Sequence, residues 1–249
     1  RSTRHTTGGV KTTAIGMALT AGVIVLTWAG IRLTADFTKE EAMHYDFMAC
    51  HQQWNRILDT VDAERPNNQI GVTVQNLALA MRGILLQRMF DYNQNGMLGL
   101  LPEIQRDATS PLPTAEAFYQ LGMVNVAQRT VFEAQEAILD YQKSARCYRR
   151  LAETNIINGD FDVARKYLKP LRNTIFYRRW AETAEEYLNS GEIFDHSRDL
   201  SEISSMRLQN HDFLFSDTEM DSMIGTLMLE NGGNMMAIQY LMAYCLLKK

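Results

Sequence analysis

The chain is short of the residues on which several protein classes depend. Only three of its 249 residues are cysteine and five are proline, which excludes a disulfide-stapled scaffold and a collagen-like or proline-rich chain. The formal net charge of −4 argues against a general nucleic-acid binder, so no nucleic-acid partner is expected. With 46% hydrophobic and 22% charged residues, the composition is that of an ordinary folded protein.

Strand signals are nearly absent after residue 35. No run rich in valine, isoleucine and threonine alternates with polar residues between hairpin dipeptides. Apolar residues instead recur at helical spacing, as in Ala164, Leu168 and Leu171. The predicted fold class is therefore all-α.

No residue pattern indicates catalysis, a cofactor or a metal site. His44 and His51 are seven positions apart, and the adjacent Cys50 would point about 100° away from His51 on a helix. Zinc needs three or four ligands, so a metal site is not expected here. A second cluster lacks the spacing and central glycine of a calcium loop; it consists of Asp212, Asp217, Glu219 and Asp221.

An uncharged apolar run near the start is the strongest single signal. It extends over 20 residues from Thr12 to Ile31, with Trp28 near one end. At ~1.5 Å per residue, such a helix covers the ~30 Å hydrocarbon core of a bilayer, and tryptophan suits the membrane interface. The alternatives are a buried core helix and a signal peptide, and the length of the run disfavours the latter.

Charge divides the chain at the same place. The first 32 residues carry +4 and no acidic residue, so the remainder carries −8. We predict a basic flank and transmembrane helix over residues 1–35 and a separate domain over 36–249. Basic residues collect on the cytoplasmic side, so Arg1, Arg4 and Lys11 predict an extracytoplasmic domain. The missing initiator methionine and the lack of a capping helix before Lys249 suggest an excerpt truncated at both ends.

A helix–turn–helix pattern over 148–168 resembles a tetratricopeptide repeat. In that family a large residue is followed by leucine and a small residue, then by a Gly-Asp-Tyr turn and a second helix with an early alanine. Small residues let the two helices approach closely, and glycine accepts the left-handed conformation that ends the first helix. The residues at these spacings are Tyr148, Leu151, Ala152, Gly159, Asp160, Phe161 and Ala164.

The same frame recurs along the chain. Turns at positions 52, 83, 129, 159, 191 and 232 are separated by 31, 46, 30, 32 and 41 residues, and the short values approach the ~34-residue period of tetratricopeptide repeats. The long values imply insertions at 93–113 and 196–215. The sequence thus predicts a tetratricopeptide-like α-solenoid of about six helix pairs after the membrane helix.

Longer strings resemble an uncharacterised family of Bacteroidota membrane proteins with a tetratricopeptide-like C-terminal region. These strings lie at 121–129, 150–160 and 176–181. In that family several membrane helices precede the repeats. The resemblance implies a bacterial inner-membrane protein but supplies no activity.

Three arginines cluster on one predicted helix. Arg146, Arg149 and Arg150, with Arg178 and Arg179 further on, could meet phosphates or lipid head groups. The alternative is pairing with nearby acids or a solvated face.

Two functions fit these features. The first is an interaction scaffold that binds a protein or peptide in the repeat groove and the lipid bilayer through residues 12–31. The alternative is an accessory domain of a multi-pass membrane enzyme, such as a lipid-linked glycosyl transferase, with no catalysis in this fragment. The repeat resemblance implies partner-binding positions on the first helix of three units: Tyr119 and Met123, Arg149 and Glu153, and Ser222 and Thr226.

Overall fold

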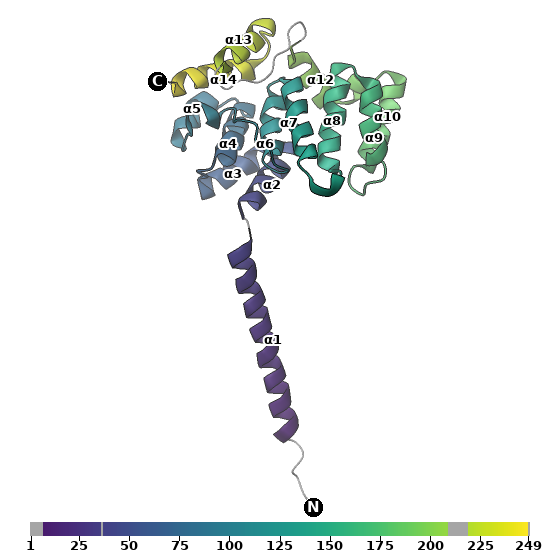
Figure 1. Ribbon diagram of the computed structural model, residues 1–249. Coiled ribbons are helices and arrows are strands. Elements are labelled where there is room, and N and C mark those ends of the chain that lie inside the picture. Colours follow the sequence, from purple (N-terminus) through teal and green to yellow (C-terminus); the bar gives the residue numbers. More distant parts are fainter. Residues whose placement is uncertain (1–6, 36, 209–218, 249) are drawn as a thin grey trace, which may run out of the picture. The chain divides into compact units, whose positions relative to one another are not determined.

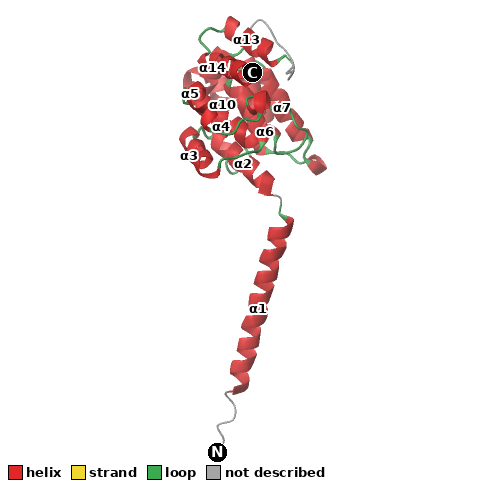
Figure 2. Ribbon diagram, turned by 90° about the vertical axis from the view of Figure 1, so that its left-hand side faces the viewer, coloured by secondary structure: helices red, strands yellow, loops and turns green. Residues whose placement is uncertain are grey.

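Helices make up all the regular structure in the part of the chain that the structure describes. This computed structural model covers residues 7–35, 37–208 and 219–248, and within them Figure 2 shows helices and loops but no strand. The all-α class is therefore confirmed. The α-helices are α1 (Thr7–Thr34), α2 (Phe37–Cys50), α3 (Trp54–Glu64), α4 (Gln69–Met81), α5 (Leu85–Arg88), α6 (Pro111–Gln120), α7 (Val124–Glu136), α8 (Ala145–Asn158), α9 (Phe161–Leu171), α10 (Arg178–Ser190), α11 (Ile193–His196), α12 (Arg198–Met206), α13 (Met220–Glu230) and α14 (Met235–Leu247).

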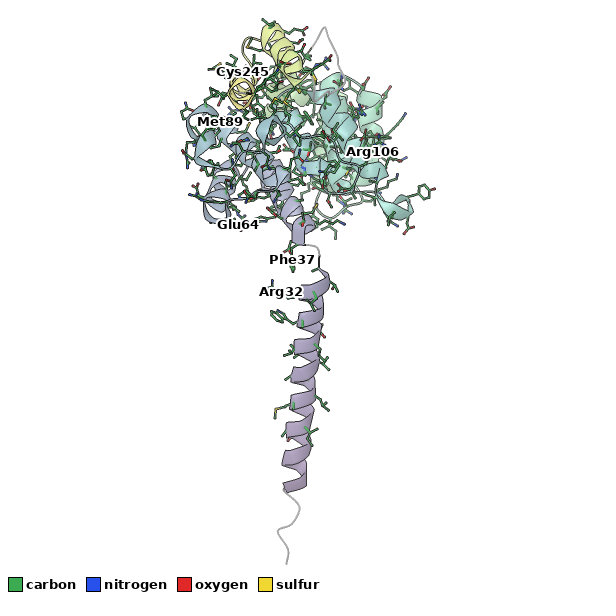
Figure 3. All side chains as sticks on the ribbon, turned by 60° about the vertical axis from the view of Figure 1, so that its left-hand side comes forward. Arg32, Phe37, Glu64, Met89, Arg106 and Cys245 are labelled. Carbon is green, nitrogen blue, oxygen red and sulfur yellow. The ribbon has the colours of Figure 1, made fainter. Side chains whose placement is uncertain are left out.

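The chain divides into two compact units, Arg1–Glu40 and Glu41–Lys249. In the first unit, Thr13–Thr34 of α1 is long and apolar enough to cross a membrane, with a mean hydropathy of 2.0 and no residue buried in the protein. Near the end of α1 the Arg32 guanidinium lies 5.6 Å from the ring centres of both Trp28 and Phe37. Figure 3 labels Arg32 and Phe37 on either side of the break between α1 and α2.

Two helices lie at the centre of the second unit. Residues 71–80 of α4 are all buried, and so is every residue of α6. A helix that is apolar around its whole circumference has to be covered on all sides, and α4 contains no charged residue while α6 contains only Glu116. The surrounding core includes Tyr45, Phe118 and Ile156.

Among the described residues of the second unit, five turns of one type connect helices. Each contains a residue with positive φ, and the next amide donates to the carbonyl five residues earlier, as Asp160 does to Asn155 at 2.9 Å. This is the Schellman ending, which satisfies carbonyls that the helix leaves unpaired. The turns join α2 to α3, α4 to α5, α6 to α7, α8 to α9 and α10 to α11; their positive-φ residues are Gln52, Gly83, Gly122, Gly159 and Gly191.

One predicted turn is wrong. Arg129 lies inside α7, and the turn falls at Gly122, where φ is +87°. The sequence frame had treated this glycine as a small residue within the first helix of the pair. The turns at 52, 83, 159, 191 and 232 are confirmed, the last lying between α13 and α14.

Of the two predicted insertions, the structure describes the first in full and the second only in part. Residues 93–113 contain the short turn Gly96–Gly99, irregular chain and the start of α6, and Asn76 on α4 anchors this segment by donating from Nδ2 to the Gly99 carbonyl at 2.9 Å. Residues 196–215 contain α12, but 209–218 lie outside the described residues.

Successive helices from α6 to α10 pack side by side in chain order (Figure 1). The last helices then return to the earlier ones. α14 packs against α4 and α5, and α12 packs against α8. Asn234 Nδ2 donates to the Leu121 carbonyl at 2.8 Å, and a Cβ on Gly122 would lie 2.6 Å from the Met206 carbonyl oxygen.

Candidate groove and its arginine network

The only charge of the buried helix α6 needs partners, and α8 supplies them. Glu116 Oε2 accepts from Arg150 Nη2 at 2.5 Å and from Arg146 Nη2 at 3.2 Å. Its other oxygen accepts from Gln120 Nε2, one helical turn later, at 2.9 Å. Arg146 and Arg150 reach one carboxylate because residues four apart share a face of a helix.

The pairing continues to α2 and along α8. Arg146 binds Asp46 with two bonds, Nε to Oδ2 at 3.1 Å and Nη2 to Oδ1 at 2.8 Å. Glu153 accepts from Arg150 Nη1 at 2.9 Å and from Arg149 Nε at 2.9 Å. Three guanidinium groups therefore meet three carboxylates, and the whole set has no net charge. We call it the arginine network; it comprises Asp46, Glu116, Arg146, Arg149, Arg150 and Glu153.

The network keeps Glu116 and Arg150 ionised despite burial. Burial alone would raise the pKa of Glu116, but the charges of Arg150 and Arg146 outweigh it, so this pKa is lowered. For Arg150, burial opposes the charge, yet Glu116 and Glu153 raise its pKa. The Arg150 guanidinium also lies 3.6 Å from the ring centre of Tyr119, in cation–π contact.

Two adjoining pockets open beside the network. The first, the polar pocket, is a cavity of about 50 Å³ lined by residues from α2, α6, α8, α10 and α12, including Tyr119, Glu153 and Asp199. The second, the aromatic pocket, is a cavity of about 490 Å³. It is lined by Met43, Asp46, Phe47, Cys50, His51, Arg146, Arg149, Phe176, Tyr177 and Trp180. Cys50, Arg149 and Trp180 line both, so the two pockets adjoin, and we call the pair the groove.

The thiol in this groove is held protonated. Burial raises the pKa of Cys50 to about 11, and its Sγ lies 3.2 Å from Nδ1 of the exposed His51. Among the described residues, no three histidine, cysteine, aspartate or glutamate side chains are grouped to hold a metal. Asp212 and Asp217 lie outside the described residues, while Asp221 pairs with Lys248 at 3.2 Å.

The structure brings three of the six predicted partner-binding residues together. Tyr119, Arg149 and Glu153 line the polar pocket, although Tyr119 is itself almost fully buried. Met123 lies in the core, because Gly122 ends α6 before the helix face reaches it. The remaining two, Ser222 and Thr226, lie one turn apart on α13 and line neither pocket of the groove.

Sequence reasoning missed two of the three carboxylates of the network, Asp46 and Glu116, and the aromatic side chains of the aromatic pocket. Asp46 and Arg146 are 100 residues apart, and no local pattern connects them. One signal was available: a single glutamate in an otherwise uncharged segment, Glu116, predicts a buried cation partner. The clustered arginines do pair with acids, as the alternative interpretation of that cluster held.

Comparison with known proteins yields a family but no activity. A family model described as a family of unknown function (DUF6057) matches residues 3–249. No curated protein and no solved structure matches the chain.

Proposed function

Since the chain belongs to the DUF6057 family, whose description assigns no activity, we propose a function from the geometry: a membrane-anchored protein-interaction scaffold. In this proposal tetratricopeptide-like helix pairs form a groove that binds a protein or peptide partner. Helix α1 anchors the domain in a bacterial inner membrane, with the helix pairs on the extracytoplasmic side.

One observation carries the proposal. Five helices that are not consecutive in the chain, α2, α6, α8, α10 and α12, contribute side chains to one small hollow. Four of them, α2, α6, α8 and α10, are the first helix of a turn-joined pair. Stacked helix pairs use this arrangement to present a continuous recognition surface. The groove also offers aromatic and arginine side chains, the types enriched at protein-binding hot spots.

The repeat interpretation is supported by the turns. Gly83, Gly122, Gly159 and Gly191 end a helix in the same left-handed conformation and start the next helix within three residues. In the pair that most resembles a tetratricopeptide repeat, Tyr148 on α8 meets Tyr167 on α9 edge to face, with ring centres 5.2 Å apart. This aromatic contact contributes to the packing of the two helices against each other.

A site-specific crosslink tests the groove. A photoreactive phenylalanine analogue is placed at Asp199, an exposed residue at the edge of the polar pocket, and the full chain is irradiated in native membranes. We expect one discrete protein adduct. The matched control carries the same analogue at Asp162 on α9, where the side chain is 96% exposed and lies outside the groove.

Comparison with the Asp162 control shows which results would contradict the proposal. Adducts of the same size from Asp162 and Asp199 would mean that the label reports proximity in the membrane and not groove binding. No adduct from Asp199 would contradict a protein partner in the groove. Either result would leave the membrane anchor to be judged separately.

A further inference from the structure

We propose that the aromatic pocket binds an anionic phospholipid, with the headgroup phosphate at Arg149 and an acyl chain along Met43, Phe47 and Phe176. The inference goes beyond the protein-partner function. It rests only on the part of the proposed function that places α1 in a bilayer.

Arg149 is the most exposed arginine of the network and has spare donors. Its Nε binds Glu153 at 2.9 Å, while Nη1 and Nη2 make no hydrogen bond or ion pair to the described residues. The side chain is 28% exposed. Its guanidinium lies 5.7 Å from the ring centre of Tyr177 and 5.2 Å from that of Trp180, which holds the two free nitrogens in place.

The charge of the pocket lining favours an anion. Two guanidinium groups, those of Arg146 and Arg149, stand against the single carboxylate of Asp46. Arg146 is occupied by Asp46 and Glu116, whereas Arg149 binds Glu153 through Nε alone, so its two terminal nitrogens are the donors open to an anion. A guanidinium edge with two donors fits two oxygens of one phosphate.

The lining of the aromatic pocket also includes exposed apolar side chains. Phe176 is 89% exposed, Phe47 49% and Met43 40%, and all three line the pocket. Exposed large apolar side chains gathered around one cavity mark a binding surface. Its volume of about 490 Å³ is in the ~300–1,000 Å³ range of small-molecule sites. An acyl chain in the pocket would remove these side chains from water.

The covalent connection to α1 favours a lipid over a soluble ligand. Met43 and Phe47 follow Thr34, the last residue of α1, by 9 and 13 residues. A ligand that belongs to the bilayer crossed by α1 is therefore always present at high local concentration. Tyr177 and Trp180 add the amphipathic aromatic side chains that proteins place at membrane interfaces.

Photolabelling of the full chain tests this assignment. The protein is reconstituted in phosphatidylcholine nanodiscs that contain a varied small fraction of photoactivatable phosphatidylglycerol, and labelled peptides are identified by mass spectrometry. We expect labels on α1 and on the peptides that carry Met43, Phe47 and Phe176. In Arg149→Gln the lipid fraction needed for half-maximal pocket labelling should rise about tenfold, because charged hydrogen bonds are lost. Arg172→Gln, which removes an exposed arginine paired with Glu185, should label like the wild type.

Each other outcome overturns the proposal. Labels on α1 alone would reject the pocket and keep the anchor, whereas no label on α1 would reject the anchor as well. Equal labelling of the pocket by photoactivatable phosphatidylcholine would show that the pocket does not select an anionic headgroup. Protection by an excess of a short acidic peptide would assign the pocket to a protein partner.

A second variant guards against misfolding. If Arg149→Gln lowers the melting temperature, Phe47→Ser replaces it, because Phe47 is half exposed and lines the aromatic pocket. Unchanged labelling in Phe47→Ser would also reject the acyl-chain contact.

Discussion

At the scale of single residues, the arginine network determines how helices α2, α6 and α8 can pack. Burying Glu116, Arg146 and Arg150 is costly, and attraction between buried charges offsets that cost only when every group is paired. Here each carboxylate meets at least one guanidinium. The network thus selects one arrangement of the three helices, because any other leaves a buried charge unpaired.

Removing one cation from the network should be strongly destabilising. Arg146→Met leaves Asp46 without its cation and strips one of two from Glu116, so we expect a loss of ~3–5 kcal/mol in the free energy of unfolding. Urea denaturation of the full chain in detergent micelles measures this. The control Arg165→Met breaks an exposed pair with Asp162 and should cost less than ~1 kcal/mol. Equal losses would mean that the network contributes no more than a surface pair.

Acid should weaken the same site in a defined direction. The folded pKa of Glu116 is lowered, whereas the unfolded value is about 4.3. The stability from this group is therefore present above about pH 4.3 and is lost as the pH falls through the folded pKa. Between pH 5 and pH 3, melting temperatures of Glu116→Gln should decline less steeply than those of the wild type. Parallel declines would count against a role for this carboxylate.

At the scale of elements, the turns between helices were predicted best, because one residue type, glycine, marks them. Gly83, Gly159 and Gly191 were placed in turns because glycine readily adopts positive φ. Gly122 was misplaced, because the repeat frame assigned it to the small position within the first helix and so put the turn at Arg129. The groove was only partly predicted. Arg149 and Glu153 belong to one local pattern on a single helix, whereas Asp46, Phe47 and Trp180 reach the site only through tertiary packing.

Two glycines of equal backbone conformation should differ in tolerance. At Gly159 (φ +82°) an added Cβ meets nothing within 4 Å, so Gly159→Ala should cost about 1 kcal/mol from the left-handed conformation alone. At Gly122 (φ +87°) the Cβ would lie 2.6 Å from the Met206 carbonyl oxygen, so Gly122→Ala should cost about 3 kcal/mol. Chemical denaturation of both variants in parallel measures the difference. A Gly122→Ala variant as stable as Gly159→Ala would show that α12 does not abut this turn.

At the scale of the whole molecule, the chain combines an apolar helix with an acidic helical domain. If α1 crosses a bilayer, charge placed at its middle should prevent stable insertion. Ile24→Asp with Leu26→Asp costs about 3 kcal/mol per residue at the centre of a membrane helix, so we expect alkaline carbonate to release this variant from membranes and to leave the wild type in the pellet. The exchange Ile24→Leu with Leu26→Ile is the control. Wild-type release by carbonate would refute the anchor.

The return of the last helices to the first ones has a consequence for synthesis on the ribosome. Asn234 bonds to the Leu121 carbonyl across 113 residues, and α14 covers α4 and α5. At ~5–20 residues per second, the early helix pairs wait roughly 6–20 s for the partner that covers them. During that time their apolar surface is open to chaperones and to premature association. An open solenoid, in which each repeat contacts only its neighbours, could complete its pairs as they emerge, whereas this domain can close only after α14 has been synthesised.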